Sequence, residues 1–289
     1  MNDDVTDAIA NLLSLKEMVR AADLQARKSL GQNFLFDLNL TGKIARAAKP
    51  FADQVIEIGP GPGGLTRALL LEQAPCVIAI EKDQRAAAFL DHLVQASQNR
   101  LSVIQADALR APVWDYGKGT RQIVANLPYN IGTALLMKWL AHSTAFVSLT
   151  LMFQKEVAQR LVARQGSSNY GRLSVMTQFK TQVQTLFDIP PEAFVPAPKI
   201  TSTVVQLIPH QDNIYPDCSD QSLERVTAIA FGQRRKMLRA SFKNFGGQDL
   251  LQAAGINPSE RPQDISVEGF CRLAACFEKN RPQAIVTKP

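Results

Sequence analysis

Short apolar runs alternate with segments of helical apolar spacing through most of the first 210 residues. Strands are predicted at 55–58, 77–80, 101–107, 121–126, 146–153 and 203–208, and helices at 38–48, 65–71 and 132–141. Strands that alternate with helices are typical of an open α/β sheet, in which ligands bind beyond the carboxyl ends of the strands. The side chains that end each strand are therefore the first candidates for function.

The two ends of the chain follow a different pattern. Residues 5–25 carry apolar positions at helical spacing and are predicted to form one amphipathic helix. The proline-rich segment 189–199 is predicted to be a stiff loop. Beyond residue 212 only helical patterns occur, near 223–230, 234–243, 248–254 and 266–279, and the residues after 279 are expected to be a loose tail. We therefore predict a domain at 1–212, with an N-terminal helical extension at 1–25, and a helical domain at 213–289.

A glycine turn follows the strand at 55–58. Gly59, Gly61 and Gly64 satisfy the G-x-G-x-x-G pattern between a strand and a helix, where glycine permits close backbone approach to a nucleotide. The next strand ends in Glu81, a carboxylate that can accept hydrogen bonds from ribose hydroxyls. A tight turn followed by a surface acid is the competing interpretation. A glycine turn after one strand together with an acid at the end of the next favours a nucleotide-binding site.

The third and fourth strands separate two classes of nucleotide-binding enzyme. Asp107 follows the third strand and is suited to accept a hydrogen bond from an adenine amino group. The fourth strand ends in Asn126-Leu-Pro-Tyr129, whose proline stiffens the turn between an amide and an aromatic ring. A dinucleotide oxidoreductase has no use for this tetrapeptide, whereas a methyltransferase acting on an exocyclic amine has one. The simpler interpretation is a strand-to-helix turn with Asn126 as a helix cap.

Composition narrows the choice of partners. The chain has 289 residues, 46% of them hydrophobic, and a net charge of +6 with a pI near 9.2. That charge favours an anionic partner, nucleic acid before membrane. The acidic start of the chain and the absence of a long apolar run predict a cytoplasmic protein. Four cysteines and three histidines form no ligand pattern, so no metal is expected.

Two groups of basic residues are candidate RNA contacts. Arg27 and Lys28 precede a glycine and an aromatic in the N-terminal region. Arg235, Arg239 and Lys243 are spaced four apart and would form one stripe on a predicted helix that begins at Arg234. Such a stripe suits phosphate contacts, although a solvated surface explains the stripe equally well and is the better explanation of Arg27 and Lys28 taken alone.

Taken together, these motifs resemble the ribosomal RNA adenine N6,N6-dimethyltransferase family, and within it the bacterial small-subunit (16S) enzymes. The resemblance is carried, in chain order, by Gly31–Leu35, Glu57–Gly63, Glu81, Asp107, Asn126–Asn130, Gln154–Val157, Tyr170–Val175, Phe194–Lys199 and Phe231–Lys236. These segments span nearly the whole chain. The resemblance implies a class I (Rossmann-like) methyltransferase fold with a mostly parallel seven-stranded sheet and a small helical C-terminal domain. The helix before Ala26 is longer than the family needs.

The resemblance also implies roles for individual residues. Asn33 and Leu35 would close over S-adenosyl-L-methionine, Gly59 would approach its methionine part, and Gly61 is a further implied cofactor contact. Glu81 would hold the ribose and Asp107 the adenine amino group. On the substrate side, the implied residues are Asn126, Leu127, Pro128, Tyr129 and Phe194. Asn126 would contact the cofactor site and accept hydrogen bonds from the target amine, while Tyr129 and Phe194 would be aromatic walls for the base.

The expected reaction is dimethylation at N6 of two adjacent adenosines in a hairpin loop near the 3′ end of small-subunit ribosomal RNA. The pre-small ribosomal subunit is the expected partner, and the chain is expected to be a monomer that takes part in ribosome biogenesis. The alternatives are an amine methyltransferase acting on DNA or another RNA, a large-subunit enzyme of the same family, and a ribosome-assembly factor without turnover. A large DNA-recognition domain does not fit in 289 residues.

Overall fold

The computed structural model describes residues 2–24, 26–27 and 31–279. The expected tail after residue 279 therefore lies outside the described residues. None of the helices in the described part of the chain combines the length and the apolar character needed to cross a membrane.

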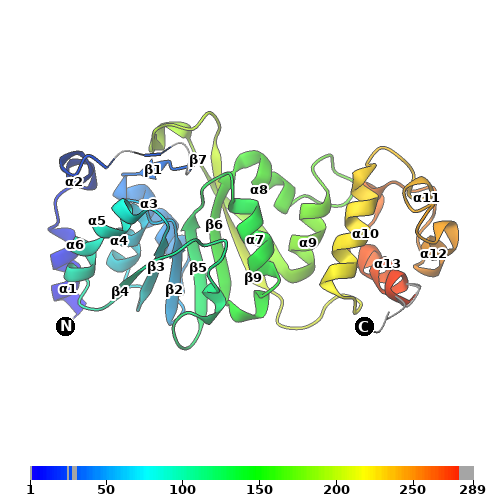
Figure 1. Ribbon diagram of the computed structural model, residues 1–289, viewed down its shortest axis with the longest axis horizontal. Helices are drawn as coiled ribbons and strands as arrows, with labels where there is room; N and C mark the ends of the chain where they lie inside the picture. The colour runs from blue at the N-terminus through cyan, green and yellow to red at the C-terminus, as the bar shows by residue number, and fades with distance from the viewer. Residues whose placement is uncertain (1, 25, 28–30, 280–289) are drawn as a thin grey trace, which may run out of the picture. The chain divides into compact units, whose positions relative to one another are not determined.

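A seven-stranded sheet with the strand order β4-β3-β2-β5-β6-β9-β7 forms the centre of the fold (Figure 1). Its strands are β2 (Gln54–Ile58), β3 (Val77–Glu81), β4 (Leu101–Gln105), β5 (Arg121–Asn126), β6 (Ser148–Gln154), β7 (Thr181–Ile189) and β9 (Ser202–Pro209). The pairs from β4 to β6 are parallel and β9 runs antiparallel to β6. The predicted α/β class and mostly parallel sheet are confirmed.

The order of the strands places their functional ends together. The chain passes from β2 to β3 to β4 in one direction and then returns to β5 on the other side of β2. Ligands bind where the strand order reverses in this way, and here that point lies between β2 and β5. Their register pairs Ile56 with Ile123, so both strands reach the same edge of the sheet.

Helices cover both faces of the sheet. They are α1 (Asn2–Ala10), α2 (Leu15–Ala21), α3 (Leu38–Ala47), α4 (Gly64–Leu71), α5 (Gln84–Phe89), α6 (Asp91–Ala96), α7 (Gly132–Leu140) and α8 (Lys155–Leu161). Helices α1 and α3 pack against α4, and α6 packs against α1. Helix α7 follows β5, where the chain advances along the sheet in the opposite direction, so a right-handed crossover places it on the other face. Asp37 and Asp83 cap α3 and α5 with side-chain hydrogen bonds.

A short second sheet lies outside the main one. Strand β1 (Phe34–Leu35) pairs antiparallel with β8 (Phe194–Val195). The prediction that 189–199 contains no regular structure is thus wrong at Phe194 and Val195. The segment remains otherwise irregular, with a 3₁₀ turn at Pro191–Ala193. Local propensity could not reveal this pairing, because its partner lies far away in the sequence.

The predicted single helix at 5–25 is also wrong. Helix α1 ends at Ala10, and the Ser14 hydroxyl accepts a hydrogen bond from the Glu17 backbone N–H to start α2 as a separate helix. Serine favours helix starts for this reason. Strand β7 was not predicted, because its side chains show little alternation between buried and exposed positions at the end of the sheet.

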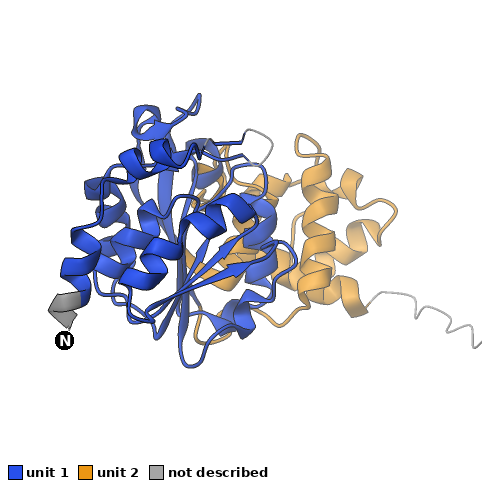
Figure 2. Ribbon diagram, turned by 60° about the vertical axis from the view of Figure 1, so that its left-hand side comes forward, with its two compact units in different colours: residues 1–158, 183–209 blue, residues 159–182, 210–289 orange. Residues whose placement is uncertain are grey.

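The chain divides by internal packing into two compact units (Figure 2). Unit 1 comprises 1–158 and 183–209, and unit 2 comprises 159–182 and 210–289. Unit 2 contains α9 (Arg172–Lys180), α10 (Asp220–Gly232), α11 (Leu238–Ser241), α12 (Gly247–Ala253) and α13 (Val267–Lys279). Its core includes the buried side chains of Leu223, Val226, Phe242 and Phe270. The functional division at residue 212 stays a prediction.

Candidate active site

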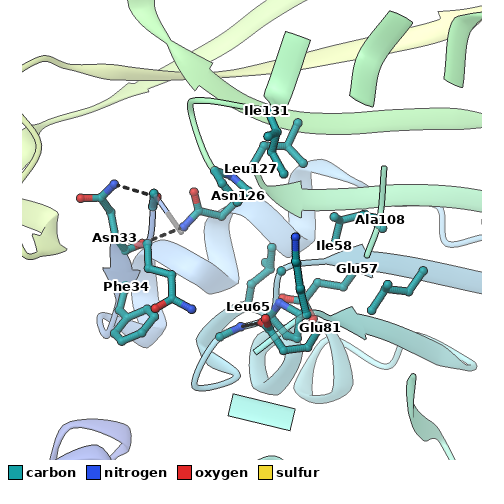
Figure 3. A pocket seen from close by; sticks show the side chains of 18 of the residues that line it. Asn33, Phe34, Glu57, Ile58, Leu65, Glu81, Ala108, Asn126, Leu127 and Ile131 are labelled. Carbon is teal, nitrogen blue, oxygen red and sulfur yellow. Dashed lines mark hydrogen bonds between the residues drawn. The ribbon is translucent and has the colours of Figure 1, made fainter. Parts of the chain in front are cut away.

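A cavity of about 170 Å³ opens at the carboxyl ends of β2, β3 and β5 (Figure 3). The predicted residues that line it are Asn33, Leu35, Gly59, Gly61, Glu81, Asp107, Asn126, Leu127 and Pro128. They come from segments spread over nearly a hundred positions of the chain. The fold thus brings together the strand ends that the sequence marked separately.

The glycine turn after β2 forms the floor of the cavity. Gly59 and Gly61 have φ values of +66° and +54°, in the region that favours glycine. A Cβ atom on Gly61 would come within 3.0 Å of Phe34 Cε1. Both the backbone conformation and the packing against Phe34 therefore require glycine at position 61.

Glu81 connects the end of β3 to this turn. Its Oε2 accepts a hydrogen bond from the Gly61 backbone N–H at 3.0 Å, and its Oε1 accepts one from the Asp83 N–H at 2.8 Å. The residue is 5% exposed. Burial raises the pKa of Glu81, although the backbone donors partly offset this. Each carboxylate oxygen retains acceptor capacity for a ligand hydroxyl.

Asp107 lies beyond β4 and is held by neighbours on two sides. Lys82 Nζ donates to its Oδ2 and the Leu109 backbone N–H donates to its Oδ1, both at 2.9 Å. The Lys82 hydrogen bond is the main cause that lowers the pKa of Asp107. The side chain is therefore an ionised acceptor at neutral pH. Lys82 also lines the cavity and was missed by the sequence reasoning.

Glu57 is a second cavity residue to which the sequence analysis gave no role. It is 2% exposed, and its Oε2 accepts a hydrogen bond from the Thr66 hydroxyl at 2.6 Å. Burial, opposed by the Thr66 hydrogen bond and reinforced by the nearby Glu81 charge, raises the pKa of Glu57 to about 8. The sequence did contain a signal for this residue, since Glu57 interrupts an otherwise apolar strand. A carboxylate is rarely buried in such a strand without a functional or structural role.

We expect Glu57→Gln to change how stability depends on pH. Below pH 4.5 the folded and unfolded chains both hold the Glu57 proton, whereas between pH 4.5 and about 8 only the folded chain holds it. Rising pH therefore favours unfolding of the wild type through this window. The glutamine variant lacks this loss and should gain on the order of 4 kcal/mol in unfolding free energy relative to the wild type between pH 5 and pH 9. Thermal unfolding at both pH values measures the difference, and parallel profiles would contradict the assignment.

Asn126 ends β5 with its amide oriented by the N-terminal segment. Its Nδ2 donates to the Asn33 backbone carbonyl at 3.2 Å (Figure 3). Among the hydrogen bonds of the described residues, none reaches Asn126 Oδ1, so this oxygen is available to a donor in the cavity. Asn33 itself donates through its side chain to the Gly31 carbonyl. Asn33 thus acts on Asn126 through its backbone.

Pro128 fits between the two glycine positions of the cavity. A Cβ atom on Gly59 would lie 3.8 Å from Pro128 Cδ, and one on Gly31 would lie 3.5 Å from Pro128 Cβ. The turn after β5 is therefore close to both the glycine turn and the N-terminal segment. Leu127 is 2% exposed and anchors this turn in the core.

Neither of the two predicted aromatic walls, Tyr129 and Phe194, is among the residues that line the cavity. Tyr129 is half-buried, and its hydroxyl forms a 2.6 Å hydrogen bond with Ser202 Oγ. Phe194 is 2% exposed, packs in the hydrophobic core and does not line the cavity. The role of Phe194 as an aromatic wall stays a prediction, and in this structure its pairing opposite Leu35 places its ring in the core.

The predicted RNA contacts do not form the expected stripe. Helix α10 ends at Gly232, a turn carries Arg235, and α11 spans only four residues that include Arg239. Lys243 follows in another turn, so a continuous helix from Arg234 to Lys243 is wrong. These three cations are nevertheless exposed.

The remaining predicted RNA contacts are Arg234 and the pair Arg27 and Lys28. The Arg234 guanidinium donates to the Ser167 and Ser168 carbonyls and so contributes to the structure of unit 2. Arg27 is exposed, and Lys28 lies outside the described residues. No group of three or more metal-ligating side chains occurs within the described ranges.

The comparisons with known proteins agree with one another. The family model for ribosomal RNA adenine dimethylase matches residues 23–279. A ribosomal RNA small subunit methyltransferase A from Paramagnetospirillum magneticum is 54% identical over 272 residues, covering 93% of this chain and 96% of that protein. A protein of the same description from Agrobacterium fabrum is 51% identical over 277 residues, with 93% and 99% coverage.

Solved structures support the same fold. A dimethyladenosine transferase from Plasmodium falciparum superposes with a TM-score of 0.73 at 28% identity, covering 85% of this chain and 98% of that one. The 23S rRNA methyltransferase ErmE superposes with a TM-score of 0.65 at 25% identity, with 85% and 100% coverage. The predicted class I methyltransferase fold is thus confirmed.

Proposed function

The chain belongs to the ribosomal RNA adenine dimethylase family, and from this premise we propose how its cavity carries out the reaction. The enzyme dimethylates adenosines of 16S ribosomal RNA at N6, with S-adenosylmethionine as methyl donor. The observation that carries the proposed site is the convergence of Gly61, Glu81, Asp107 and Asn126 on one cavity.

The residues fit the cofactor by the chemistry of their polar groups. Glu81 has carboxylate oxygens at the glycine turn, which suits a ribose with two hydroxyl donors. The ionised Asp107 suits an adenine amino group. Glu57 also lines the cavity and holds its proton at neutral pH, and the positive charge of a bound sulfonium and ammonium group would lower its pKa. Gly59 and Gly61 leave room for the methionine part, and Asn33 and Leu35 border the opening.

The bound cofactor supplies an electrophilic methyl group on a positively charged sulfur. The task of the protein is to orient the acceptor nitrogen, whose lone pair is delocalised into the adenine ring. Asn126 Oδ1 and the Leu127 backbone carbonyl can accept hydrogen bonds from the amine, which favours a tetrahedral nitrogen with its lone pair free. Fixed acceptors of this kind also stabilise the positive charge that develops on nitrogen.

The neutral side chain of Asn126 suits a second methylation. After the first transfer the amine retains a single N–H, so a site that needs only one donor can bind the base again. The target base must leave its stack, and we propose that Tyr129, three residues after Asn126 in the chain, offsets part of that cost by stacking. Phe194 could assist only after a local movement that frees its ring, because it is buried.

The position of the target adenosines in the RNA and the working state of the enzyme are further parts of the proposal. We propose that the targets are two adjacent adenosines in a hairpin loop near the 3′ end of the small-subunit RNA, since loop bases cost least to extrude. We further propose that the enzyme acts as a monomer, without a metal, in the cytoplasm during subunit biogenesis.

Replacing Arg235, Arg239 and Lys243 together by alanine should weaken binding to small ribosomal subunits. If each contacts a phosphate, the slope of log affinity against log salt should become shallower by about 2 to 3. A charge-matched control replaces Lys16, Arg20 and Lys118, three exposed cations of unit 1. Equal changes in both triple variants would mean that only net charge matters, and the unit 2 contact would be rejected.

Methyl transfer to different nucleic acids tests the function as a whole. We expect labelled methyl groups from S-adenosylmethionine to appear on small-subunit RNA, as N6,N6-dimethyladenosine in nuclease digests. Large-subunit RNA and double-stranded DNA should remain unlabelled in parallel reactions. Labelling confined to either of those would contradict the proposed substrate.

A further inference from the structure

Helices α1 and α2 precede the part of the chain that the family model matches, which starts at residue 23. They are nonetheless packed into unit 1, since Val5, Ile9 and Leu15 are buried with exposures of 5%, 0% and 3%. Val5 and Ile9 belong to the same hydrophobic core as residues of α4. This N-terminal helical pair therefore belongs to the folded unit that holds the cavity.

A buried arginine fixes the helical pair to α4. The Arg67 guanidinium donates hydrogen bonds to the backbone carbonyls of Leu13 at 2.9 Å and of Ala10 and Leu12 at 3.0 Å each. These carbonyls lie at the end of α1, where helix carbonyls lack partners. Arg67 is only 4% exposed. The positive charge also matches the partial negative charge of the helix end.

Arg67 lies on the helix that starts at the cofactor turn. Helix α4 begins at Gly64, directly after Gly59–Gly63, and both Gly64 and Leu65 line the cavity. A displacement of the first turn of α4 would therefore move the glycine turn as well.

A second contact acts at the start of the same helix. A Cβ atom on Gly64 would come 3.2 Å from Leu15 Cδ2 and 2.3 Å from the Leu35 carbonyl oxygen. Leu15 is the first residue of α2 and Leu35 ends β1. The start of α4 is thus held between the N-terminal helical pair on one side and the strand that borders the cavity on the other.

We propose that α1 and α2 are a positioning element for the cofactor turn, acting through Arg67 and Leu15 on the start of α4. Their contacts hold the glycine turn in the conformation that binds the cofactor, so its affinity depends on residues that do not touch it. This inference rests on the proposed use of the cavity for S-adenosylmethionine.

The chain offers a matched control for a purely structural role. Arg100 lies near the other end of α4. Its Nη2 donates hydrogen bonds to the Leu70 and Ala74 backbone carbonyls, both at 2.9 Å. Burial lowers the pKa of both Arg67 and Arg100. The two arginines thus cap backbone carbonyls in similar ways, but only Arg67 acts near the glycine turn.

The test compares cofactor binding by the full-length wild type with that of Arg67→Ala, Arg67→Lys, Arg100→Ala, Leu15→Ala and a chain lacking residues 2–13. Calorimetry with S-adenosylhomocysteine gives Kd, thermal unfolding gives Tm, and steady-state kinetics separates KM for the methyl donor from kcat. We expect Arg67→Ala and the deletion to raise Kd and KM roughly five- to tenfold, with kcat at saturating donor unchanged. Arg67→Lys should recover part of the affinity.

Arg100→Ala should lower Tm about as much as Arg67→Ala while its Kd stays within twofold of the wild type. Equal Kd values for the two arginine variants, or wild-type affinity in the folded deletion chain, would overturn the proposal. If the deletion and Arg67→Ala fail to fold, Leu15→Ala decides, since an unchanged Kd there would also overturn it. A wild type that binds no S-adenosylhomocysteine would instead contradict the proposed function.

Discussion

Asn126→Ala is expected to lower kcat for methyl transfer roughly 100- to 1,000-fold, the range seen when one preorganised polar group is removed from a transition state. Asn126 lines the cavity, and its amide is oriented because its nitrogen donates to the Asn33 carbonyl, which leaves the amide oxygen as an acceptor for the substrate. Alanine removes the acceptor and leaves the amine planar and poorly nucleophilic. Initial rates with small-subunit RNA at saturating cofactor measure the loss.

Cofactor binding provides the control for this variant. The residues assigned to the ribose and the adenine, Glu81 and Asp107, make their hydrogen bonds independently of Asn126. The Kd for S-adenosylhomocysteine should therefore stay within a few-fold of the wild-type value. Normal turnover in Asn126→Ala would remove this residue from the mechanism.

Glu81→Ala is expected to weaken cofactor binding by about 2 to 3 kcal/mol, a factor of roughly 30 to 150 in Kd. The substitution removes the proposed ribose acceptor and also leaves the Gly61 and Asp83 N–H groups without their carboxylate partner. The glycine turn should loosen as a result. Calorimetric titration with S-adenosylhomocysteine measures the change.

Glu72→Ala is a suitable control for the loss of a carboxylate. Glu72 forms ion pairs with Arg46 and Lys49 at the end of α4, and it does not line the cavity. Its removal should leave the cofactor Kd unchanged. If Glu81→Ala also binds the cofactor normally, the ribose is held elsewhere.

The features that were predictable from sequence are those encoded locally. Each of Gly59, Glu81 and Asn126 directly follows or ends a short β-branched run, and parallel strands carry such ends to one edge of a sheet. The cavity could therefore be assembled from strand order alone. The burial of Glu57 was also readable, since a carboxylate interrupts an apolar strand.

The features that were missed depend on contacts between distant segments. Phe194 enters the core because it lies opposite Leu35 in a two-stranded sheet, which no local pattern indicates. The salt bridge between Lys82 and Asp107 joins the ends of two strands and has no signature in either. The basic stripe failed because spacing by four implies one face only within a continuous helix, and the chain turns after Gly232.

A crystal structure with S-adenosylhomocysteine bound would test the central claim most directly. It should place the ribose hydroxyls on Glu81, the adenine amino group on Asp107 and the sulfur facing Asn126. A ligand bound outside this cavity, or with its sulfur directed away from Asn126, would contradict the proposed active site.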